Sequence, residues 1–491
     1  MAQPAAESQA SEHREAPKSR RYVDTKESVG FVLYDVAASW NIAKHDSLYL
    51  TDVLRIDFDF TAAFKPILAV WDVINDIFLA SFIEKTRTRF GKFRPYLIAY
   101  ALIAVPIIVF YYTMGSIWGA RPTTDITKLA VFVVINVIRN LADSAGAIAR
   151  TGIIATITPD IRDRTRLITQ AQLLSGFVEK APEILLGMLI DLSNNDVIGT
   201  PLPTIFAWGG VLTVIGGGLM SFYFAIKSRE RVPQSLEPPK IKESFRSLSG
   251  NRPLILMMLA EFLGAFSLNP GTSLYFTNVL KFNTMSTVTG IPGAIVSPLS
   301  FAYVPKLRTK LSTRTLWIAG THAGDILLLF VFFVGRIGSN FKRLAVMIPA
   351  FMLQETLFMT VWGVRKVIPE ELRNEAIDYG EWKNGFRAES MTGVAKGLPN
   401  KLVTSLGESV KALILKYIGY EQGAKAGTQT FETERKLFTM VTLLPVVTSA
   451  IGIIPKLMYN IDQKTRERMY AELAERRSRL SVSEAEQPKD A

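Results

Sequence analysis

The chain contains no cysteine. Disulfide bonds, thiolate metal sites and cysteine nucleophiles are therefore excluded, and the sequence does not indicate a redox compartment. The first 28 residues also lack an apolar segment behind their basic residues, which argues against a cleaved signal peptide. We expect residues 1–28 to form a disordered cytoplasmic tail.

The apolar residues are grouped in long blocks. Of the 491 residues, 48% are hydrophobic, and their runs are about 20 residues long, which is the length of a helix that crosses a bilayer. We therefore predict an all-α membrane protein with about twelve transmembrane helices. The expected spans lie near residues 29–50, 58–82, 95–114, 127–156, 167–191, 203–227, 253–276, 286–305, 315–335, 342–364, 390–418 and 436–458.

The formal net charge is +12, but the basic residues do not gather on one soluble face. They are concentrated in alternate loops, at residues 85–94, 162–166, 227–252, 306–314 and 365–387, and are absent from residues 192–202. The positive-inside rule then places both termini and the central connection in the cytoplasm. We expect a multi-pass protein of the plasma (inner) membrane and no nucleic-acid partner.

A polar, proline-containing segment divides the spans into two sets of six. Residues 228–252, with Pro233, Pro238 and Pro239, read as a cytoplasmic linker between halves at residues 29–227 and 253–459. Similar Pro-acid-x-Arg loops follow the fourth and tenth spans, at residues 158–166 and 368–375. Two such halves fit the major facilitator plan, in which they rock about a midplane site. Residues 460–491 are expected to form a cytoplasmic tail that begins as an amphipathic surface helix.

Two carboxylates stand inside the second span. Asp72 and Asp76 are four residues apart and share one helix face. A carboxylate at mid-bilayer costs roughly 2.5–3.5 kcal/mol, so the pair predicts a bound cation. Lys65 lies on the same stripe and is expected to pair with Asp72; a purely structural ion pair is the alternative reading.

Further polar residues occupy other spans. Arg139, Asp143 and Arg150 align on one face of the fourth span, and Lys396 and Lys401 lie within the eleventh. The fifth span contains Glu179, Lys180 and Glu183. These residues either take part in function or form a salt bridge with one another.

A cytoplasmic gate is predicted from two charged segments. Arg87, Arg89 and Arg94 follow the second span, and guanidinium groups suit carboxylates on neighbouring helix ends. Lys85 and Lys92 in the same loop are better explained as topology determinants. The expected partner segment contains Asp378, Glu381, Arg387 and Glu389.

Two motifs carry a family resemblance. Asp72, Asn75 and Asp76 with TRTRFGKFRPY at residues 86–96, and IDYGEWKNGFRAE at residues 377–389, resemble the glycoside-pentoside-hexuronide:cation symporters. The resemblance implies the major facilitator fold, symport driven by Na⁺, Li⁺ or H⁺, and no cofactor beyond the coupling cation. It also implies a cation site at Asp72, Asn75, Asp76 and Ser144, which would be a metal site for sodium, with Lys401 as the counter-ion of the empty site. Carboxylate, amide and hydroxyl oxygens suit such a hard cation.

The substrate positions of the family are only partly kept. The acid of the first span falls at Asp35 only with a one-residue shift, and Ala147, Thr151 and Gln172 stand where a galactoside carrier has an acid, a tryptophan and an arginine. Galactoside recognition is therefore in doubt. The remaining candidates for the substrate site are Asp35, Trp40, Asp143, Arg150, Trp362 and Lys396. Either tryptophan would stack on a sugar ring or anchor the membrane interface.

Three other functions were weighed. An intramembrane prenyltransferase-type enzyme needs a second acid-rich helix, and residues 288–304 contain no acid. A lysolipid or other amphiphile carrier shares the motifs, and a nontransporting sensor would not need Asp72, Asp76 and Lys401. We predict that the chain is not an enzyme but a cation-coupled symporter of a glycoside or related small polar solute. Arg139, Arg150 and Lys396 favour an anionic sugar such as a hexuronide.

Overall fold

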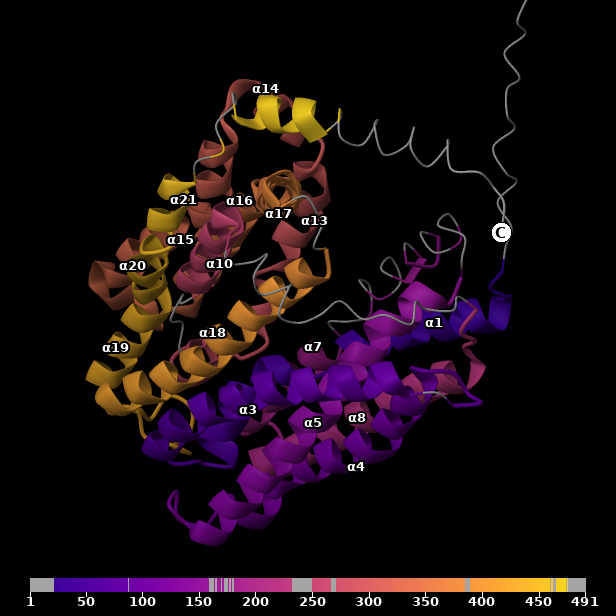
Figure 1. Ribbon diagram of the computed structural model, residues 1–491. Helices are drawn as coiled ribbons and strands as arrows, with labels where there is room; N and C mark the ends of the chain where they lie inside the picture. Colours follow the sequence, from indigo (N-terminus) through magenta and orange to yellow (C-terminus); the bar gives the residue numbers. More distant parts are fainter. Residues whose placement is uncertain are drawn as a thin grey trace, which may run out of the picture.

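The computed structural model describes residues 22–475 with several gaps. The gaps are residues 87, 159–162, 164–165, 169, 172–174, 176–177, 179–180, 232–249, 266–270, 385–388, 460, 462–464 and 474, and side chains are omitted at residues 77, 80–81, 84–85, 151, 155, 265, 374, 384 and 389–401. Arg87, Arg387, most of the linker and residues 1–21 of the predicted tail therefore lie outside the described residues. Residues 25–28 of that predicted tail belong to a helix instead. The described chain is folded into helices joined by short loops (Figure 1).

The first half contains the helices that carry its six predicted spans. They are α1 (Thr25–Ser39) with the short turns η1 (Ala43–His45), α2 (Asp46–Leu48) and η2 (Tyr49–Val53), then α3 (Phe58–Lys85), α4 (Arg94–Trp118), α5 (Ile126–Thr156), α7 (Ala181–Asn194) and α8 (Leu202–Lys227). Aspartate side chains begin three of these helices. Asp24, Asp57 and Asp125 each accept a hydrogen bond from the backbone N–H three residues on, which satisfies an amide that the helix itself leaves free.

The helices of the second half are more often broken. They are α10 (Arg252–Ala265), α11 (Thr272–Asn278), α12 (Met285–Val288), α13 (Ile291–Ser300), α14 (Val304–Lys310), α15 (Thr313–Arg336), η3 (Ile337–Lys342), α16 (Leu344–Met359), α17 (Trp362–Asn384), α18 (Glu389–Tyr417), α19 (Phe431–Thr442), α20 (Leu444–Ala450) and α21 (Ile453–Met458). Pro445 and Pro455 lie at the breaks of the last span, where proline removes a backbone donor.

Described helical residues fall on each predicted span. Within the described residues, five helices are long and apolar enough to cross a membrane, or up to seven when each bent pair counts as one span, by length and composition alone. The first span is broken after Ser39 and the seventh after Ala265, and two helix starts also differ from the prediction. The first helix begins at Thr25 rather than near residue 29, because Asp24 caps it, and the last span begins at Phe431 rather than near 436, because Thr430 does the same.

The two halves meet at one end and diverge toward the other. Helix α3 of the first half packs along α18 of the second, and the halves spread apart toward the right of the view (Figure 1). One core cluster contains buried residues of both halves, among them Tyr49, Phe64, Tyr275 and Phe438. Two further clusters lie each within a single half. The halves therefore share an apolar core at only one of these three places.

Polar contacts join the halves at the same end. The carboxylate of Asp52 accepts hydrogen bonds from Tyr420 Oη at 2.8 Å, Asn278 Nδ2 at 3.3 Å and the Gly423 N–H at 3.2 Å. Exposed ion pairs also cross there, with Asp59 bound to Lys416 and Asp196 to Lys425. The loops between the first and second spans and between the eleventh and twelfth are thus fixed to each other. We call this region, residues 52–59 with 278 and 416–425, the closed end.

Candidate functional site

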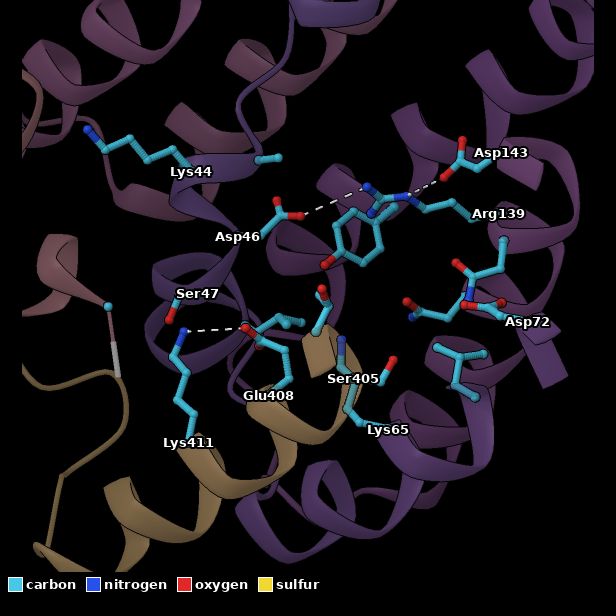
Figure 2. Close-up of a pocket in the computed structure, with 18 of the residues that line it drawn as sticks. Lys44, Asp46, Ser47, Lys65, Asp72, Arg139, Asp143, Ser405, Glu408 and Lys411 are labelled. Atoms are coloured by element: carbon cyan, nitrogen blue, oxygen red, sulfur yellow. Dashed lines mark ion pairs between the residues drawn. The ribbon is translucent and has the colours of Figure 1, made fainter. Parts of the chain in front are cut away.

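A cavity of about 550 Å³ lies between the two halves, next to the closed end (Figure 2). Its charged and polar lining residues are Lys44, Asp46, Ser47, Lys65, Asp72, Asn136, Arg139, Asn140, Asp143, Thr272, Ser273, Thr404, Ser405, Glu408 and Lys411. They come from the first, second, fourth and eleventh spans and from the start of α11. A site built by both halves is what an alternating-access carrier places at its centre.

Arg139 organises one wall of this cavity. Its guanidinium lies 3.9 Å from Asp46 Oδ2 and 3.6 Å from Asp143 Oδ2, and it stacks 4.9 Å over the Tyr111 ring. Tyr112 Oη donates to Asp46 Oδ1 at 2.7 Å. The alignment of Arg139 with Asp143 follows from their i, i+4 spacing, as expected. The role of Asp46 was missed, because it comes from another span and no local spacing points to it.

A second cavity of about 400 Å³ lies within the first half and shares Arg139 and Asp143 with the first cavity. Trp40 and Arg150 are among its lining residues. Arg150 Nη2 donates to Asp35 Oδ1 at 2.7 Å, and Ser175 Oγ donates to Asp35 Oδ2 at 2.8 Å. The structure thus brings four predicted substrate residues together here, since Asp143, Arg150 and Trp40 face the cavity and Asp35 holds Arg150.

The other two predicted substrate residues are placed differently. Trp362 begins α17, where it contacts Phe358 at 6.1 Å between ring centres and Lys366 at 4.7 Å, and it lines neither cavity. This position at the bend between α16 and α17 suits an aromatic anchor. Lys396 lies on α18, and its side chain is outside the described set.

The predicted cation residues lie on neighbouring helices. Asp72, Asn75 and Asp76 are on α3, Asp72 lines the central cavity, and Ser144 is buried on α5, which packs against α3. Asn75 is 6% exposed, and its Nδ2 has no hydrogen-bond partner within the described part of the chain. The described residues contain no cluster of three or more His, Asp or Glu fit to hold a metal ion. The structure thus places the predicted ligands on two helices that are in contact, and their joint binding of a cation stays a prediction.

Lys65 and Lys401 are the two lysines predicted to act near this region. The expected ion pair between Lys65 and Asp72 is not found among the described residues, although both residues line the central cavity. Seven residues separate the two by about 10 Å along the helix, and side chains lean toward the helix N-terminus, so Lys65 extends away from Asp72. Lys401 is on α18, which packs along α3, but its side chain is not described.

The predicted cytoplasmic gate is seen in part. Arg94 donates to the carbonyl oxygens of Ala225 at 3.1 Å and Ile226 at 2.7 Å, so it is bound to α8 of its own half. The Arg89 guanidinium lies 4.7 Å from the centre of the Phe90 ring. Asp378 and Glu381 are on α17, and Glu389 begins α18 with its side chain undescribed. Pairing of these arginines with α17 remains a prediction for another conformation.

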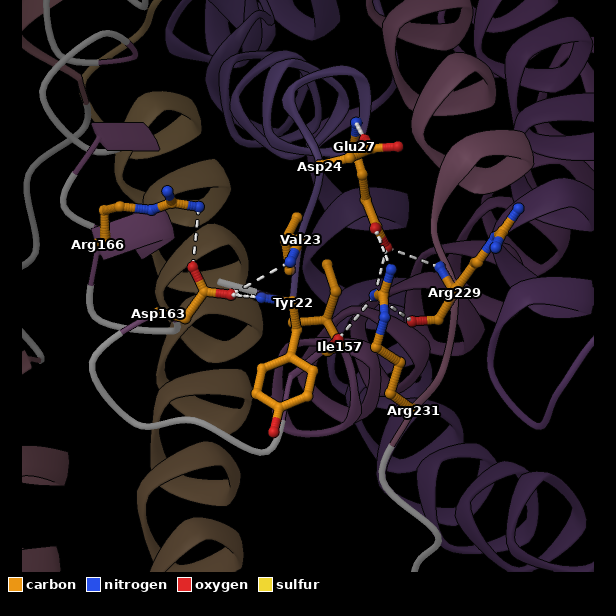
Figure 3. Close-up of polar contacts among 9 residues, drawn as sticks. All are labelled: Tyr22, Val23, Asp24, Glu27, Ile157, Asp163, Arg166, Arg229 and Arg231. Carbon is orange, nitrogen blue, oxygen red and sulfur yellow. Dashed lines mark hydrogen bonds and ion pairs between the residues drawn. The ribbon is translucent and has the colours of Figure 1, made fainter. Parts of the chain in front are cut away.

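Residues 229–231 hold the loops of the first half together, which the sequence did not indicate (Figure 3). Arg231 Nη2 pairs with Glu27 Oε2 at 2.7 Å, and this hydrogen bond raises the pKa of the Arg231 guanidinium. Glu230 accepts from the N–H groups of Lys92 at 2.9 Å, Phe93 at 2.8 Å and Arg94 at 3.1 Å. We call residues 229–231 the linker anchor.

Asp163 adds a further contact on this face. Its Oδ2 accepts from the N–H groups of Tyr22 at 3.0 Å and Val23 at 3.3 Å, and its Oδ1 pairs with Arg166 at 2.9 Å (Figure 3). Asp163 belongs to the repeated loop at residues 158–166. The corresponding residues of the second half, predicted as a loop, lie within α17, where Glu375 pairs with Arg466 of the C-terminal segment. Each of the two similar segments therefore binds a terminal segment of the chain.

Comparison with known proteins gives consistent relatives. A family model described as "MFS/sugar transport protein" matches residues 28–463. The chain is 24% identical to the uncharacterized symporter YnaJ of Bacillus subtilis (92% of this chain, 95% of that protein). It is 21% identical to the glucuronide carrier protein homolog of Escherichia coli (91% and 95%) and 22% identical to the isoprimeverose transporter of Lactiplantibacillus pentosus (93% and 93%).

Solved structures show the same fold at low sequence identity. A bacterial homolog of the human lysosomal transporter Spinster has a TM-score of 0.59 at 12% identity, over 92% of this chain and 99% of that one. A bacterial homologue of the iron transporter ferroportin has a TM-score of 0.58 at 14% identity, over 89% and 98%. The predicted fold class and the resemblance drawn from the two motifs are confirmed, and the enzyme alternative is excluded. The chain belongs to the MFS/sugar transport protein family, and it is an integral multi-pass membrane transporter.

Proposed function

We propose that the protein is a symporter that couples the movement of a glycoside or related small polar solute to a cation, Na⁺ or H⁺. The observation that carries the proposal is the placement of Asp72, Asn75 and Asp76 on α3, with Asp72 at the wall of a cavity built by both halves. Two carboxylates in a bilayer require a positive charge, and a cation that enters with the substrate supplies it. Relatives described as a symporter, a glucuronide carrier and an isoprimeverose transporter support this class of solute.

The solute is proposed to bind in the two adjoining cavities. Sugars are recognised by planar polar groups and by aromatic faces, and Arg139, Asp143, Arg150 and Trp40 provide both kinds of contact. An amphiphile carrier is the alternative. The central cavity favours the sugar, because its walls carry both lysines and carboxylates, which an acyl chain would desolvate without compensation.

The cation is proposed to bind between α3 and α5. Asp72, Asp76, the Asn75 amide oxygen and the Ser144 hydroxyl supply the hard oxygen ligands that a sodium ion needs. Lys401 on α18 takes over the positive charge when the site is empty, because two carboxylates one turn apart would otherwise be buried unneutralised. The empty carrier is then able to reorient.

The halves alternate between two arrangements in this scheme. We place the protein in the plasma (inner) membrane, with the linker and both termini in the cytoplasm. In this orientation the closed end faces outward and the described arrangement opens inward. Closing of the inner end brings Arg89 and Arg94 toward Asp378 and Glu381.

Uptake into proteoliposomes tests the proposal. A panel of labelled glycosides is offered under imposed Na⁺ or H⁺ gradients, first to the unchanged protein and then to Asp76→Asn. We expect the variant to lose accumulation against a gradient while it retains substrate binding, because coupling needs the charge that the cation neutralises. Asp59→Asn is the matched control, since Asp59 lies on the same helix but is 60% exposed.

Lys401→Ala separates the steps of the cycle. Net uptake should fall more than cation-dependent exchange, because exchange never requires the empty carrier to reorient. Normal accumulation by both Asp72→Asn and Asp76→Asn would refute the cation site. Equal loss of exchange and net uptake in Lys401→Ala would make that lysine a binding or structural residue.

A further inference from the structure

Lys65 lines the central cavity without a direct ion pair among the described residues. It lies in the second turn of α3, its side chain is half-buried, and it makes no ion pair or hydrogen bond within the described part of the chain. The carboxylates of Asp46 and Asp143 across the cavity are already bound to Arg139. A partly buried ammonium group without a partner favours a ligand that brings a negative charge.

A second ammonium group approaches from the other half. Lys411 on α18 is 12% exposed, and its Nζ lies 3.7 Å from Glu408 Oε1, at the long limit for an ion pair (Figure 2). Glu408, Lys411 and Lys65 all line this cavity (Figure 2). Two ammonium groups around one carboxylate leave an excess of positive charge at this wall of the cavity.

An unused hydroxyl lies beside Lys411. Ser47 Oγ is buried and has no hydrogen-bond partner among the described residues. A methyl group added at Gly271 would lie 3.5 Å from Ser47 Oγ and 3.6 Å from Lys411 Nζ, so both groups border the same small space. This space opens into the cavity that both halves line. A buried donor left without a partner is costly unless a ligand or water satisfies it.

We propose that Lys65 and Lys411, one from each half, form a subsite for the carboxylate of an anionic sugar, with Ser47 as an additional donor. The inference rests on the proposed transport function and specifies its substrate class as hexuronides and their glycosides. It also gives a reason for coupling. Lys65 repels a cation at Asp72 and Asp76 along the same helix, and a bound carboxylate removes this repulsion. Substrate and cation should therefore raise each other's affinity by the same factor.

The subsite is tested with two substrates that differ only at C6. Labelled 4-nitrophenyl β-D-glucuronide and 4-nitrophenyl β-D-glucoside are compared in proteoliposomes for the unchanged protein, Lys65→Gln, Lys65→Arg and Lys411→Gln. We expect both glutamine variants to raise the KM for the glucuronide about 10- to 100-fold, the range for loss of a hydrogen bond to a charged group. The KM for the glucoside should change by less than about twofold, and Lys65→Arg should retain most glucuronide affinity.

Lys416→Gln is the control for loss of a charge on α18, because Lys416 is 56% exposed and pairs with Asp59 outside the cavity. Glucoside uptake by each variant shows that it is folded. An equal loss of uptake for both substrates would overturn the proposed subsite. An unchanged KM for the glucuronide in Lys65→Gln would do so as well. Uptake of the glucoside alone by the unchanged protein would also overturn it, whereas uptake of neither glycoside would refute the proposed function itself.

Discussion

The two ends of the interface between the halves are built differently. At the closed end, a single apolar cluster contains residues of both halves, and Asp52 accepts hydrogen bonds from three residues of the second half. At the other end, the polar contacts described above stay within one half: Arg94 binds α8, Glu27 binds Arg231, and Glu375 binds Arg466. Each half also has its own apolar cluster.

This difference indicates how the molecule is able to change shape. The loops of the open end have their polar groups satisfied inside their own half, so each half moves as a unit without leaving buried groups unpaired. Opening of the closed end must instead break hydrogen bonds and separate a shared apolar core. The closed end therefore sets most of the free-energy difference between the two arrangements.

The largest effect is expected from the buried carboxylate of the closed end. Asp52→Ala removes the acceptor of three hydrogen bonds and leaves Tyr420 and Asn278 buried without it, which should shift the ratio of the two arrangements toward outward opening about 10- to 100-fold. Spin labels at Val197→Cys and Tyr417→Cys, both exposed and on opposite halves, report the distance in a chain free of other cysteines.

The control at the same end is the exposed pair of Asp196 and Lys425, whose side chains are 73% and 58% exposed. Asp196→Asn should change the distance distribution very little, because exposed ion pairs contribute about 0–1 kcal/mol. Equal shifts in Asp52→Ala and Asp196→Asn would show that burial does not distinguish the two contacts.

A smaller effect is expected at the open end. Arg89→Glu and Asp378→Arg should each slow transport roughly fivefold, since an ion pair worth about 1 kcal/mol would be lost when this end closes. The double reversal should partly restore the rate. Independent, additive losses in this double-mutant cycle, measured as initial uptake rates, would contradict direct pairing.

The smallest effect on transport is expected from the linker anchor. Glu230→Ala removes the acceptor of the N–H groups of residues 92–94, so hydrogen exchange of these amides should accelerate about tenfold while uptake falls about twofold. Glu432→Ala serves as control, because Glu432 is 63% exposed and pairs only locally with Lys436. An unchanged rate of hydrogen exchange at residues 92–94 would contradict this, because it would mean that the carboxylate does not stabilise these amides.

Local patterns in the sequence predicted the helices well. The apolar run of residues 203–227 corresponds to α8 at Leu202–Lys227, and the run of residues 127–156 corresponds to α5 at Ile126–Thr156. An apolar run is a property of consecutive residues, so a single sequence is sufficient to predict these helices. The spacing of Arg139 and Asp143 likewise predicted their contact, because it depends only on helix geometry.

Contacts between distant segments could not be predicted in the same way. The pairing of Asp35 with Arg150 and of Asp52 with Tyr420 depends on how the spans pack against each other. No local sequence pattern marks either pair. For Lys65, the helix face was predicted correctly but the ion pair with Asp72 was not. Both residues line the cavity, but side chains lean toward the helix N-terminus, so the ammonium group of Lys65 extends away from Asp72.

The pairing of Glu27 with Arg231 has a consequence for synthesis. The two residues are 204 positions apart, so at about 5–20 residues per second the glutamate leaves the ribosome roughly 10–40 s before its arginine does. Helix α1 must enter the bilayer without this partner. This face of the first half is completed only when translation has passed the sixth span. The segment that follows, residues 232–249, gives an interval for this step before the second half is synthesised.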